Sequence, residues 1–435
     1  MNLRSYIKKL DAEKKLIRIK KPVASKYEAA NILAELDGTP VIFENINDHK
    51  IQVAGNLNSS RDLVAMALGT EKEKLLELMS KSINNLKSPK TVKTAPCQEV
   101  VEKDINLKNL PIMTYLKEDG GPYIPSAIIV VKDKELGRNV CFHRMMVIGK
   151  DKLAVRVVEN RGTYNALKKS KGNLEVAICI GNSTAVLLAA ATSIKPNEDE
   201  FALANAIEKT DLVKCKTVDL EVPADTEIVL EGIITDELAD EGPFMDLTGT
   251  LDFVRKQPTI KINCITRRKD AIYQTLLPGL SEHKILMGMP REPTILNEVK
   301  KVVKCKIVLL TPGGNAWLHA VVQIEKRKAD DGKKAIEAAF KGHNSLKLVT
   351  VVDDDINLYD SADVEWALST RFQAAKDTII MLNQPSSSLD PSAEKKDKEK
   401  TKTSKLGLDA TIPWDKNRKE FEKSGYKKIN LKKYI

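Results

Sequence analysis

The sequence has few of the features that identify the commonest classes of protein. Its six cysteines lie singly and form no Cys-x-x-Cys pair, which argues against a disulfide framework and against a thiolate zinc site. No apolar run approaches the ~20 residues that cross a bilayer. The first 21 residues alternate in charge and lack the apolar core of a secretory signal. We therefore expect a cytoplasmic protein without membrane insertion.

Short catalytic motifs are also missing. The sequence contains neither the G-x-G-x-x-G fingerprint of dinucleotide-binding folds nor a Walker A loop. It has no Gly-x-Ser-x-Gly nucleophile elbow and no His-Glu-x-x-His zinc signature, and its five histidines lie far apart. The generic motifs of nucleotide-binding proteins, hydrolases and zinc proteases therefore do not describe this chain.

The chain is basic, but its charge is not arranged as in most nucleic-acid-binding proteins. It carries 70 Lys and Arg against 60 Asp and Glu, a net charge of +10, with a pI near 9.0. Much of the excess is lysine in residues 71–91, 394–405 and 427–435, and aromatic residues make up only 5%. Stacking platforms for bases are thus scarce. A lysine-rich solvated surface, or attraction for anionic small molecules, is the favoured interpretation.

Changes in pattern divide the 435 residues into three parts. Residues 1–95 alternate helical and short strand patterns, which predicts a small α/β domain. Residues 96–281 contain many closely spaced strand patterns with two helical interruptions, which predicts a closed or partly closed barrel. Helix and strand alternate again over 282–435, predicting a second α/β domain. Within it, the polar residues 385–404 predict a mobile segment.

The stretch DELADEGPFMDLTGTLDF, residues 236–253, sets two acids on either side of a Gly-Pro turn. Glu241 and Asp246 are five positions apart, so neither a regular strand nor a regular helix would bring them together. Gly242 and Pro243 break both regularities, and a bend here predicts that the carboxylates converge. Converging carboxylates often mark acid/base chemistry, because a cation or a shared proton must relieve their repulsion. A solvated acidic loop is the alternative.

Several segments taken together resemble the UbiD-like decarboxylases, which use prenylated FMN. They follow one order and spacing along the chain: NVCFHRMMVIGKDKLAVRVVENRG (139–162), DEFALA (199–204), DLEVPADTEIVLEG (219–232), EGPFMDLTG (241–249), VDDDIN (352–357), WALSTR (366–371) and KLGLDAT (405–411). The resemblance implies a carboxy-lyase with a mixed α+β, multi-domain fold. Its parts would be an N-terminal α/β domain, a central split β-barrel of the flavin-reductase-like kind, and a C-terminal α/β domain used in oligomerisation.

The resemblance also implies a catalytic role for the acidic turn. Arg144 matches the arginine of a Glu-Arg-acid network in the family, and Glu241 and Asp246 match its two acids. The planar fork of Arg144 can pair bidentately with Glu241 and still present donors to a substrate carboxylate. Asp246 would deliver the proton that replaces carbon dioxide.

A cofactor site is implied as well. Asn139 and Glu200 match ligands of a divalent ion, usually manganese, that bridges to the flavin phosphate, and potassium is a further candidate. Asn160 stands where better-known members have histidine, which leaves the identity of the metal open. Lys405 matches a phosphate-binding lysine. The expected flavin contacts are Phe142, His143, Arg144, Arg156, Val157, Val158, Arg161 and Gly162. For His143 the alternative is a packed histidine. For Arg156 and Arg161 the alternative is ordinary surface charge.

Residues 276–293, LLPGLSEHKILMGMPREP, match a segment that approaches the substrate in related enzymes. Here they include His283, Lys284 and Arg291, enough positive charge for a phosphate monoester. In this the chain resembles an archaeal branch of the family. Members of that branch convert trans-anhydromevalonate 5-phosphate to isopentenyl phosphate in a modified mevalonate pathway of isoprenoid biosynthesis.

Three alternatives stay open at this point. Lys284 and Arg291 could serve only as ion-pair partners of Glu282 and Glu292. The chain could be a polyprenyl-hydroxybenzoate or other aromatic-acid decarboxylase, or, outside enzymes, a basic nucleic-acid-binding protein. The favoured reading implies a phosphorylated unsaturated acid as substrate, a prenyl-flavin synthase as cofactor supplier, no nucleic acid, and a homo-oligomer, either dimer or hexamer.

Overall fold

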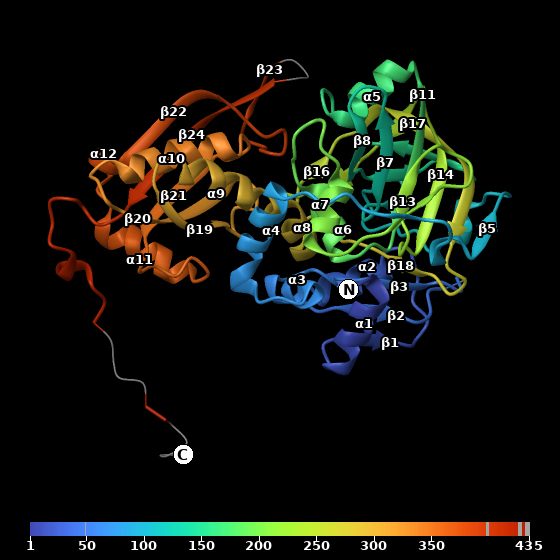
Figure 1. Cartoon of the computed structure of the whole chain (residues 1–435), viewed down its shortest axis with the longest axis horizontal. Helices are drawn as coiled ribbons and strands as arrows, with labels where there is room; N and C mark the ends of the chain where they lie inside the picture. Colours follow the sequence, from blue (N-terminus) through green and yellow to red (C-terminus); the bar gives the residue numbers. More distant parts are fainter. Residues whose placement is uncertain (48, 397–399, 425–428, 431–435) are drawn as a thin grey trace.

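The computed structural model describes residues 1–47, 49–396, 400–424 and 429–430. Parts of the predicted mobile segment 385–404 and of the basic end 427–435 therefore lie outside the described residues. Figure 1 shows two lobes side by side. One lobe holds the first two parts of the chain, and the other holds the helices and strands from α9 onward.

The N-terminal part is a small sheet with helices, as its alternating pattern predicts. The sheet has the order β1 (Ile17–Ile19), β2 (Val41–Phe43), β3 (Gln52–Gly55) and β18 (Ile272–Gln274), and the helices are α1 (Leu3–Ala12), α2 (Glu28–Glu35) and α3 (Arg61–Leu68). Helix α1 begins where the Asn2 side chain accepts the Ser5 N–H at 3.0 Å. It buries Leu3, Ile7 and Leu10 at helical spacing.

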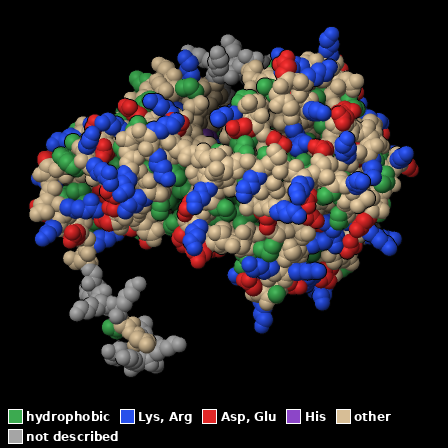
Figure 2. All heavy atoms as spheres, in the orientation of Figure 1, with side chains coloured by type: hydrophobic (Ala, Val, Ile, Leu, Met, Phe, Trp, Pro, Cys, Tyr) green, Lys and Arg blue, Asp and Glu red, His purple; other side chains and the backbone are tan. Residues whose placement is uncertain are grey.

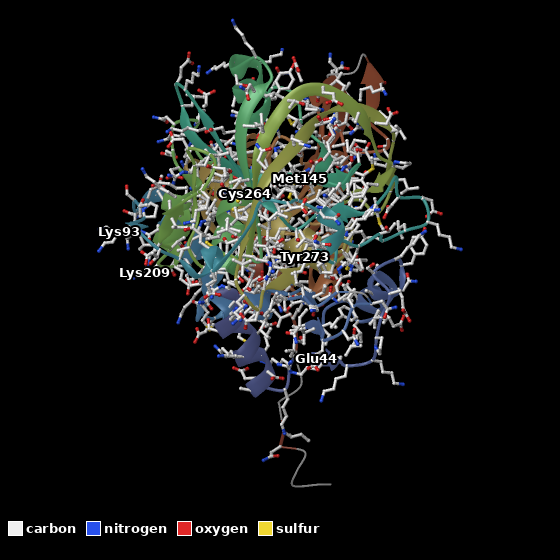
Figure 3. The ribbon with its side chains drawn as sticks, turned by 90° about the vertical axis from the view of Figure 1, so that its right-hand side faces the viewer. Glu44, Lys93, Met145, Lys209, Cys264 and Tyr273 are labelled. Carbon is white, nitrogen blue, oxygen red and sulfur yellow. The ribbon has the colours of Figure 1, made fainter. Side chains whose placement is uncertain are left out.

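Strand β18 connects the second part of the chain to the N-terminal sheet. It falls within 96–281, yet it pairs in parallel with β3 of the N-terminal sheet. Tyr273 of β18 is fully buried, and Figure 3 shows it where the N-terminal part meets the larger sheet. Local pattern cannot reveal this pairing, because the partner strands are more than 200 residues apart in the sequence.

One nine-stranded sheet accounts for the strand-rich second part. Its order is β6 (Tyr123–Ile124), β9 (Met145–Val147), β10 (Lys152–Val155), β17 (Arg255–Arg267), β14 (Ile228–Glu241), β11 (Asn173–Ile180), β7 (Ile128–Asp133) and β8 (Gly137–Phe142), and β5 (Val100–Glu102) also pairs with β17. Bulges bend β14 at Glu231/Gly232 and Thr235/Leu238. Over the described residues the order is an open path, so the split-barrel description stays a prediction.

Both faces of the large sheet are buried. In β7, Ile129 packs into one core with the N-terminal part, and its neighbour Ile128 packs into a second core with helices α6 (Thr184–Ala191) and α7 (Glu200–Ile207). Figure 3 shows Met145 and Cys264 inside this part, with Lys93 and Lys209 at its margin and Glu44 near the N-terminal sheet. Burial of both faces explains why β7 reads as a continuous apolar run rather than an alternating one.

Smaller elements complete this lobe. They are α4 (Leu75–Asn84), β4 (Thr91–Val92), α5 (Gly162–Ser170), β12 (Leu212–Lys214), β13 (Glu221–Pro223), β15 (Phe244–Met245), β16 (Leu251–Asp252) and α8 (Ser281–Gly288). Strands β15 and β16 form a hairpin directly after the Gly-Pro turn. Within the described ranges, no helix is both long and apolar enough to cross a bilayer.

The second lobe is a six-stranded sheet with helices on both faces. Its strands are β19 (Lys304–Leu310), β20 (His319–Glu325), β21 (Leu348–Asp353), β24 (Lys400–Ala410) and β22 (Thr378–Pro385), with β23 (Glu394–Lys396) paired to β24. Helices α9 (Glu292–Lys300) and α10 (Asp331–Gly342) pack into one core, and α11 (Ser361–Arg371) into another, followed by the short α12 (Ala374–Asp377). The lobes touch where Ser80 of α4 donates to Asn297 of α9 at 3.2 Å.

The mobility of segment 385–404 stays a prediction, but its described residues are paired in strands. They include β23 and the first part of β24, and Pro385 and Glu394 both lie opposite Lys402 in the two strand pairs. Strand β23 lies at the edge of the sheet, where charged residues discourage pairing with other chains, whereas this part of β24 lies between β22 and β23. The polar composition alone did not predict these strands.

Arg371 allows a test of how much a buried ion pair stabilises the second lobe. Its fully buried guanidinium bonds Asp353 at 3.1 Å and Asp355 at 2.9 and 2.6 Å. Arg371→Met should lower the free energy of unfolding by about 3–5 kcal/mol, because Asp353 would keep a buried charge without its cation. Arg418→Met, which removes a half-exposed ion pair with Asp354, should cost less than about 1 kcal/mol. Denaturant unfolding of both variants makes the comparison, and equal losses would contradict it.

Candidate active site

The Gly-Pro turn is held by a second loop. Strand β14 ends at Glu241, and Gly242 follows with φ of +102°, a conformation that favours glycine. The Gly120 N–H donates to the Pro243 carbonyl at 2.9 Å. A side chain at Gly120 would lie 2.2 Å from the Gly242 carbonyl oxygen. The turn that separates the two acids is thus packed against backbone and cannot shift freely.

The structure brings the three predicted catalytic residues together. Arg144, between β8 and β9, donates from Nε to Glu241 Oε1 at 2.8 Å and from Nη2 to Glu241 Oε2 at 3.0 Å. Its Nη1 lies 3.4 Å from Asp246 Oδ2. Glu241 is completely buried, and the Asp246 side chain keeps a quarter of its surface exposed. The two acids therefore converge on one cation, and the less tightly bound acid is the one open to a ligand.

Aromatic side chains build the wall of this network. The Tyr123 hydroxyl donates to Glu241 Oε1 at 3.0 Å and accepts the Gly242 N–H at 3.0 Å. The Tyr123 ring stacks on Phe244 at 3.9 Å between centroids, and the Arg144 guanidinium lies 5.7 Å from the Phe244 ring. Burial alone would lower the pKa of Arg144, but its bonds to Glu241 outweigh this and raise it. Arg144 is therefore a permanent cation.

Three participants in the network were not predicted. Asp252 accepts a bond from Arg144 Nη2 at 2.8 Å and is held by Arg255 at 2.7 and 2.6 Å. Asp252 lies in the acidic stretch already noted, so its position could have signalled a role. Tyr123 and Arg255 offered no such signal, because their contacts depend on how the hairpin and β6 fold against each other.

Two predicted metal ligands lie around β8. Glu200, at the start of α7, accepts the Val140 N–H at 2.9 Å, next to Asn139. Burial raises the pKa of Glu200 to about 8. The Asn139 side-chain oxygen lies where a Cβ on Gly162 would come within 2.2 Å. A buried carboxylate and a neighbouring amide oxygen fit a hard cation.

Asn160 does not join this pair in the structure. It is exposed, has φ of +60°, and makes no recorded contact with Asn139 or Glu200. Among the residues that the structure describes, no group of three or more His, Cys, Asp and Glu could hold a metal ion. A metal ion bound beside Glu200 would thus need amide oxygens among its ligands, as in the predicted ligand set.

The strands expected to contact flavin are organised by a buried histidine. His143 bonds the Arg156 carbonyl at 2.6 Å and the Thr163 hydroxyl at 3.0 Å, and burial lowers its pKa to about 4. It is a neutral, packed histidine. The Val157 N–H donates to Gln257 at 2.8 Å, whereas Val158 is exposed. Arg156 is not simple surface charge, because burial lowers its pKa.

A cationic cluster lies near the meeting of the lobes. Lys405 is buried, donates to the Asn344 carbonyl at 2.8 Å, and has its pKa lowered to about 8 by burial. Burial, and then the charge of Arg161, lower the pKa of Arg291 to about 10. His343 lies near both Arg291 and Lys405, which together with burial lower its pKa to about 3.

This cluster lacks counterions. In the described part of the chain, Arg161, Arg291 and Lys405 form no ion pair, and Arg291 Nε is buried without a hydrogen-bond partner. Arg291 does donate from Nη1 to the Ser193 hydroxyl and lies 5.4 Å from the Trp317 ring. Lys405 is buried, Arg291 is half-buried and Arg161 is exposed, and cations without carboxylate partners fit an anionic ligand such as a phosphate.

His283 lies at the catalytic end, where the charges of Asp246 and Arg144 act on it, and Lys284 follows it in α8. His283 Nδ1 accepts the Gly279 N–H at 3.0 Å, and burial lowers the pKa of His283 to about 4, against the opposing effect of the Asp246 charge. The alternative in which Lys284 and Arg291 only form ion pairs with Glu282 and Glu292 is wrong. Glu282 is bonded by Asn58 at 2.8 and 3.1 Å, and Glu292 by Arg61 and the Leu310 N–H.

The surface does not collect one sign of charge on the face seen in Figure 2. Lys and Arg side chains are interspersed there with Asp and Glu over both lobes, and the surface is hollowed between the lobes. The positive charge without acidic partners is instead the cluster of Arg161, Arg291 and Lys405 described above.

Known families cover nearly all of the chain. Residues 7–83, 90–281 and 284–410 match the models of the N-terminal, Rift-related and C-terminal domains of 3-octaprenyl-4-hydroxybenzoate carboxy-lyase, the UbiD domains. The chain is 44% identical over 405 residues to the anhydromevalonate phosphate decarboxylase of Methanocaldococcus jannaschii, covering 92% of this chain and 94% of that protein. It is 43% identical over 417 residues to that of Methanosarcina mazei, covering 94% and 96%.

Solved structures agree with this assignment. The UbiD-class enzyme HmfF from Pelotomaculum thermopropionicum, in complex with FMN, superposes with a TM-score of 0.95 at 35% identity over the whole of both chains. An evolved dimeric form of HmfF, in complex with prFMN, superposes with a TM-score of 0.91 at 34% identity, also over both whole chains.

Proposed function

The chain belongs to the UbiD family of carboxy-lyases, and from this premise we propose that it removes carbon dioxide from trans-anhydromevalonate 5-phosphate to give isopentenyl phosphate. The observation that carries the proposal is the pairing of two features. Arg144 lies between two acids and can receive a carboxylate, and Arg161, Arg291 and Lys405, which form no ion pair among the described residues, can receive phosphates. A substrate with a carboxylate at one end and a phosphate at the other satisfies both.

The chain's own residues would carry the proton and the charge. Glu241 holds Arg144 bidentately, so that Nη1 can bind the substrate carboxylate. As that carboxylate leaves as carbon dioxide, Asp246 gives its proton to the carbon that carried it, and solvent restores the proton. Prenylated FMN, when bound, supplies the electron sink for the bond that breaks.

We propose that the cofactor is held from the other side of the site. Asn139 and Glu200 would bind a divalent ion, manganese, which offsets the charge of the flavin phosphate. Lys405 and Arg161 would bind that phosphate directly, and Arg291 is available to either phosphate. A prenyl-flavin synthase would supply the cofactor, since the modified flavin must be made elsewhere.

We also propose that the chain forms a homo-oligomer through its second lobe. Ile380 and Leu382 of β22 have the same orientation on the strand and are each about two-thirds exposed, at 64% and 65%. Leu406 of β24 lies opposite Ile380 and adds to the same strip. An exposed apolar strip on a sheet is typical of a protein interface.

The first prediction concerns the proton donor. Asp246→Asn should retain flavin and lower kcat by about 10²-fold or more, because an amide cannot donate the proton. Asp240→Asn, on the exposed neighbouring strand residue paired with Lys256, is the matched control and should leave kcat unchanged. Turnover is measured per bound flavin. A cofactor-loaded Asp246→Asn enzyme with near wild-type turnover would remove Asp246 from this role.

A second prediction concerns the metal. Glu200→Gln should lower bound divalent metal and bound flavin together, because the ion connects the protein to the phosphate. Glu198→Gln, two residues away and partnered by the Lys195 N–H, should lower neither. Metal analysis and flavin absorbance of the purified proteins give both readings. Full metal occupancy in Glu200→Gln would show that this carboxylate is not a ligand.

The third prediction concerns the substrate. No ion pair of Lys284 occurs among the described residues, and it lies beside His283. Lys284→Met should lower kcat/KM for the phosphorylated acid by about 10- to 100-fold, the loss expected when a charge-assisted contact of ~1.5–3 kcal/mol disappears. Activity on an unphosphorylated analogue should change little.

The ratio of these two losses decides the role of Lys284. Equal losses on both acids would mean that Lys284 supports the fold or the flavin instead of the phosphate. If the wild-type enzyme itself showed no preference for the phosphorylated acid, the aromatic-acid alternative would become the better assignment.

A further inference from the structure

Asp252 forms the shortest bond to Arg144 outside the Glu241 pair. It ends the β15–β16 hairpin, and its Oδ2 accepts from Arg144 Nη2 at 2.8 Å. Both of its oxygens are held by Arg255, at 2.7 and 2.6 Å, where β17 begins. Burial would raise the pKa of Asp252, but Arg255 and Arg144 outweigh this and lower it. Asp252 is therefore a fixed anion beside the catalytic arginine.

The donors of Arg144 show what this anion does. A guanidinium has five N–H groups. The one on Nε and both on Nη2 are occupied by Glu241 and Asp252 at 2.8–3.0 Å. Nη1 has only the 3.4 Å contact with Asp246, and its other N–H has no partner among the described residues. The guanidinium is thus anchored along one edge, and the opposite edge is left for a ligand.

Charge balance leads to the same conclusion. Arg144 and Arg255 supply two positive charges, and Glu241 and Asp252 supply two negative charges at bonding distance. Asp246 is not needed to neutralise the pair of arginines. Without Asp252, the free Nη2 donor and the unbalanced charge of Arg144 would draw the guanidinium toward Asp246, the nearest remaining carboxylate.

We propose that Asp252, itself held by Arg255, is a positioning residue that keeps the ion pair between Arg144 and Asp246 long, at 3.4 Å. Arg144 Nη1 is thereby left for the substrate carboxylate, and Asp246 is left free to hold and give its proton. The proposal rests on the proposed decarboxylation. It predicts an effect on the reacting geometry, whereas a merely structural Asp252–Arg255 pair would affect only the stability of the hairpin.

The kinetic test compares two ion pairs that both include a residue of β17, Asp252 with Arg255 and Asp240 with Lys256. Asp252→Asn should lower kcat per bound flavin by about 10- to 100-fold, the scale of a misplaced catalytic group, and leave KM within about threefold. Asp240 and Lys256 form an exposed pair between β14 and β17, and Asp240→Asn and Lys256→Met should change neither value. A purely structural role would instead lower the melting temperature and flavin content without changing kcat per flavin.

Three further variants test whether Arg255 acts through Asp252. Arg255 acts through Asp252, so Arg255→Met should lower kcat less than Asp252→Asn, and the double variant should lose no more than Asp252→Asn alone. Asp252→Glu keeps the charge and should recover most of the turnover. Losses that multiply in the double variant, or an Asp252→Glu enzyme as slow as Asp252→Asn, would overturn the proposal.

A crystal structure of Asp252→Asn gives a reading that needs no turnover. The distance from Arg144 Nη1 to Asp246 Oδ2 should shorten from 3.4 Å to below about 3.0 Å, a full hydrogen bond. An unmoved guanidinium would overturn the positioning role. If the loaded wild-type enzyme did not decarboxylate the phosphorylated acid, the proposed function would fail, and this distance would still decide the role of Asp252.

Discussion

The buried charge of Arg144 is the constraint on which the catalytic end of the molecule depends. A guanidinium withdrawn from water is stable only if carboxylates and hydrogen-bond acceptors meet nearly all of its donors. Glu241, Asp252 and Asp246 do so from three points of one short stretch of chain. That stretch must therefore turn sharply, and Gly242 and the close approach of Gly120 make the turn possible. Removal of any strong partner would leave a buried charge without its counterion. The positions of the partners of Arg144 therefore depend on one another.

The polarity of the site differs from one end to the other. Around Arg144, acids are in excess, and one of them keeps contact with solvent. Near the meeting of the lobes the reverse holds, because Arg161, Arg291 and Lys405 have no acidic partner among the described residues and burial lowers the pKa of the last two. The second environment favours phosphate groups, and the first can hold a carboxylate and a proton. Under the proposed function, this difference in charge would orient the ligands.

Long-range pairing connects the site to the rest of the fold. Arg144 follows β8 at one edge of the large sheet, Glu241 ends β14 near its middle, and Arg255 begins β17 beside β14. The pairing of β18 with β3 carries the chain back to the N-terminal sheet just before α8, which presents His283 and Lys284. Lys405 comes from the other lobe, on β24. The site is therefore assembled from all three parts of the chain, and its geometry depends on how they pack.

The sequence by itself determined the class of fold, the alternation of its parts and the family, because hydrophobic periodicity is local and the family segments keep their order along the chain. The five-residue spacing of Glu241 and Asp246 around a Gly-Pro turn was enough to predict that they converge. Only the tertiary structure decided that Asp252 bonds Arg144, that Tyr123 bonds Glu241, and that β18 pairs with the N-terminal sheet. The physical reason is common to all three. Each depends on contacts between segments distant in the sequence, and neither residue spacing nor composition contains the distance between such segments once the chain is folded.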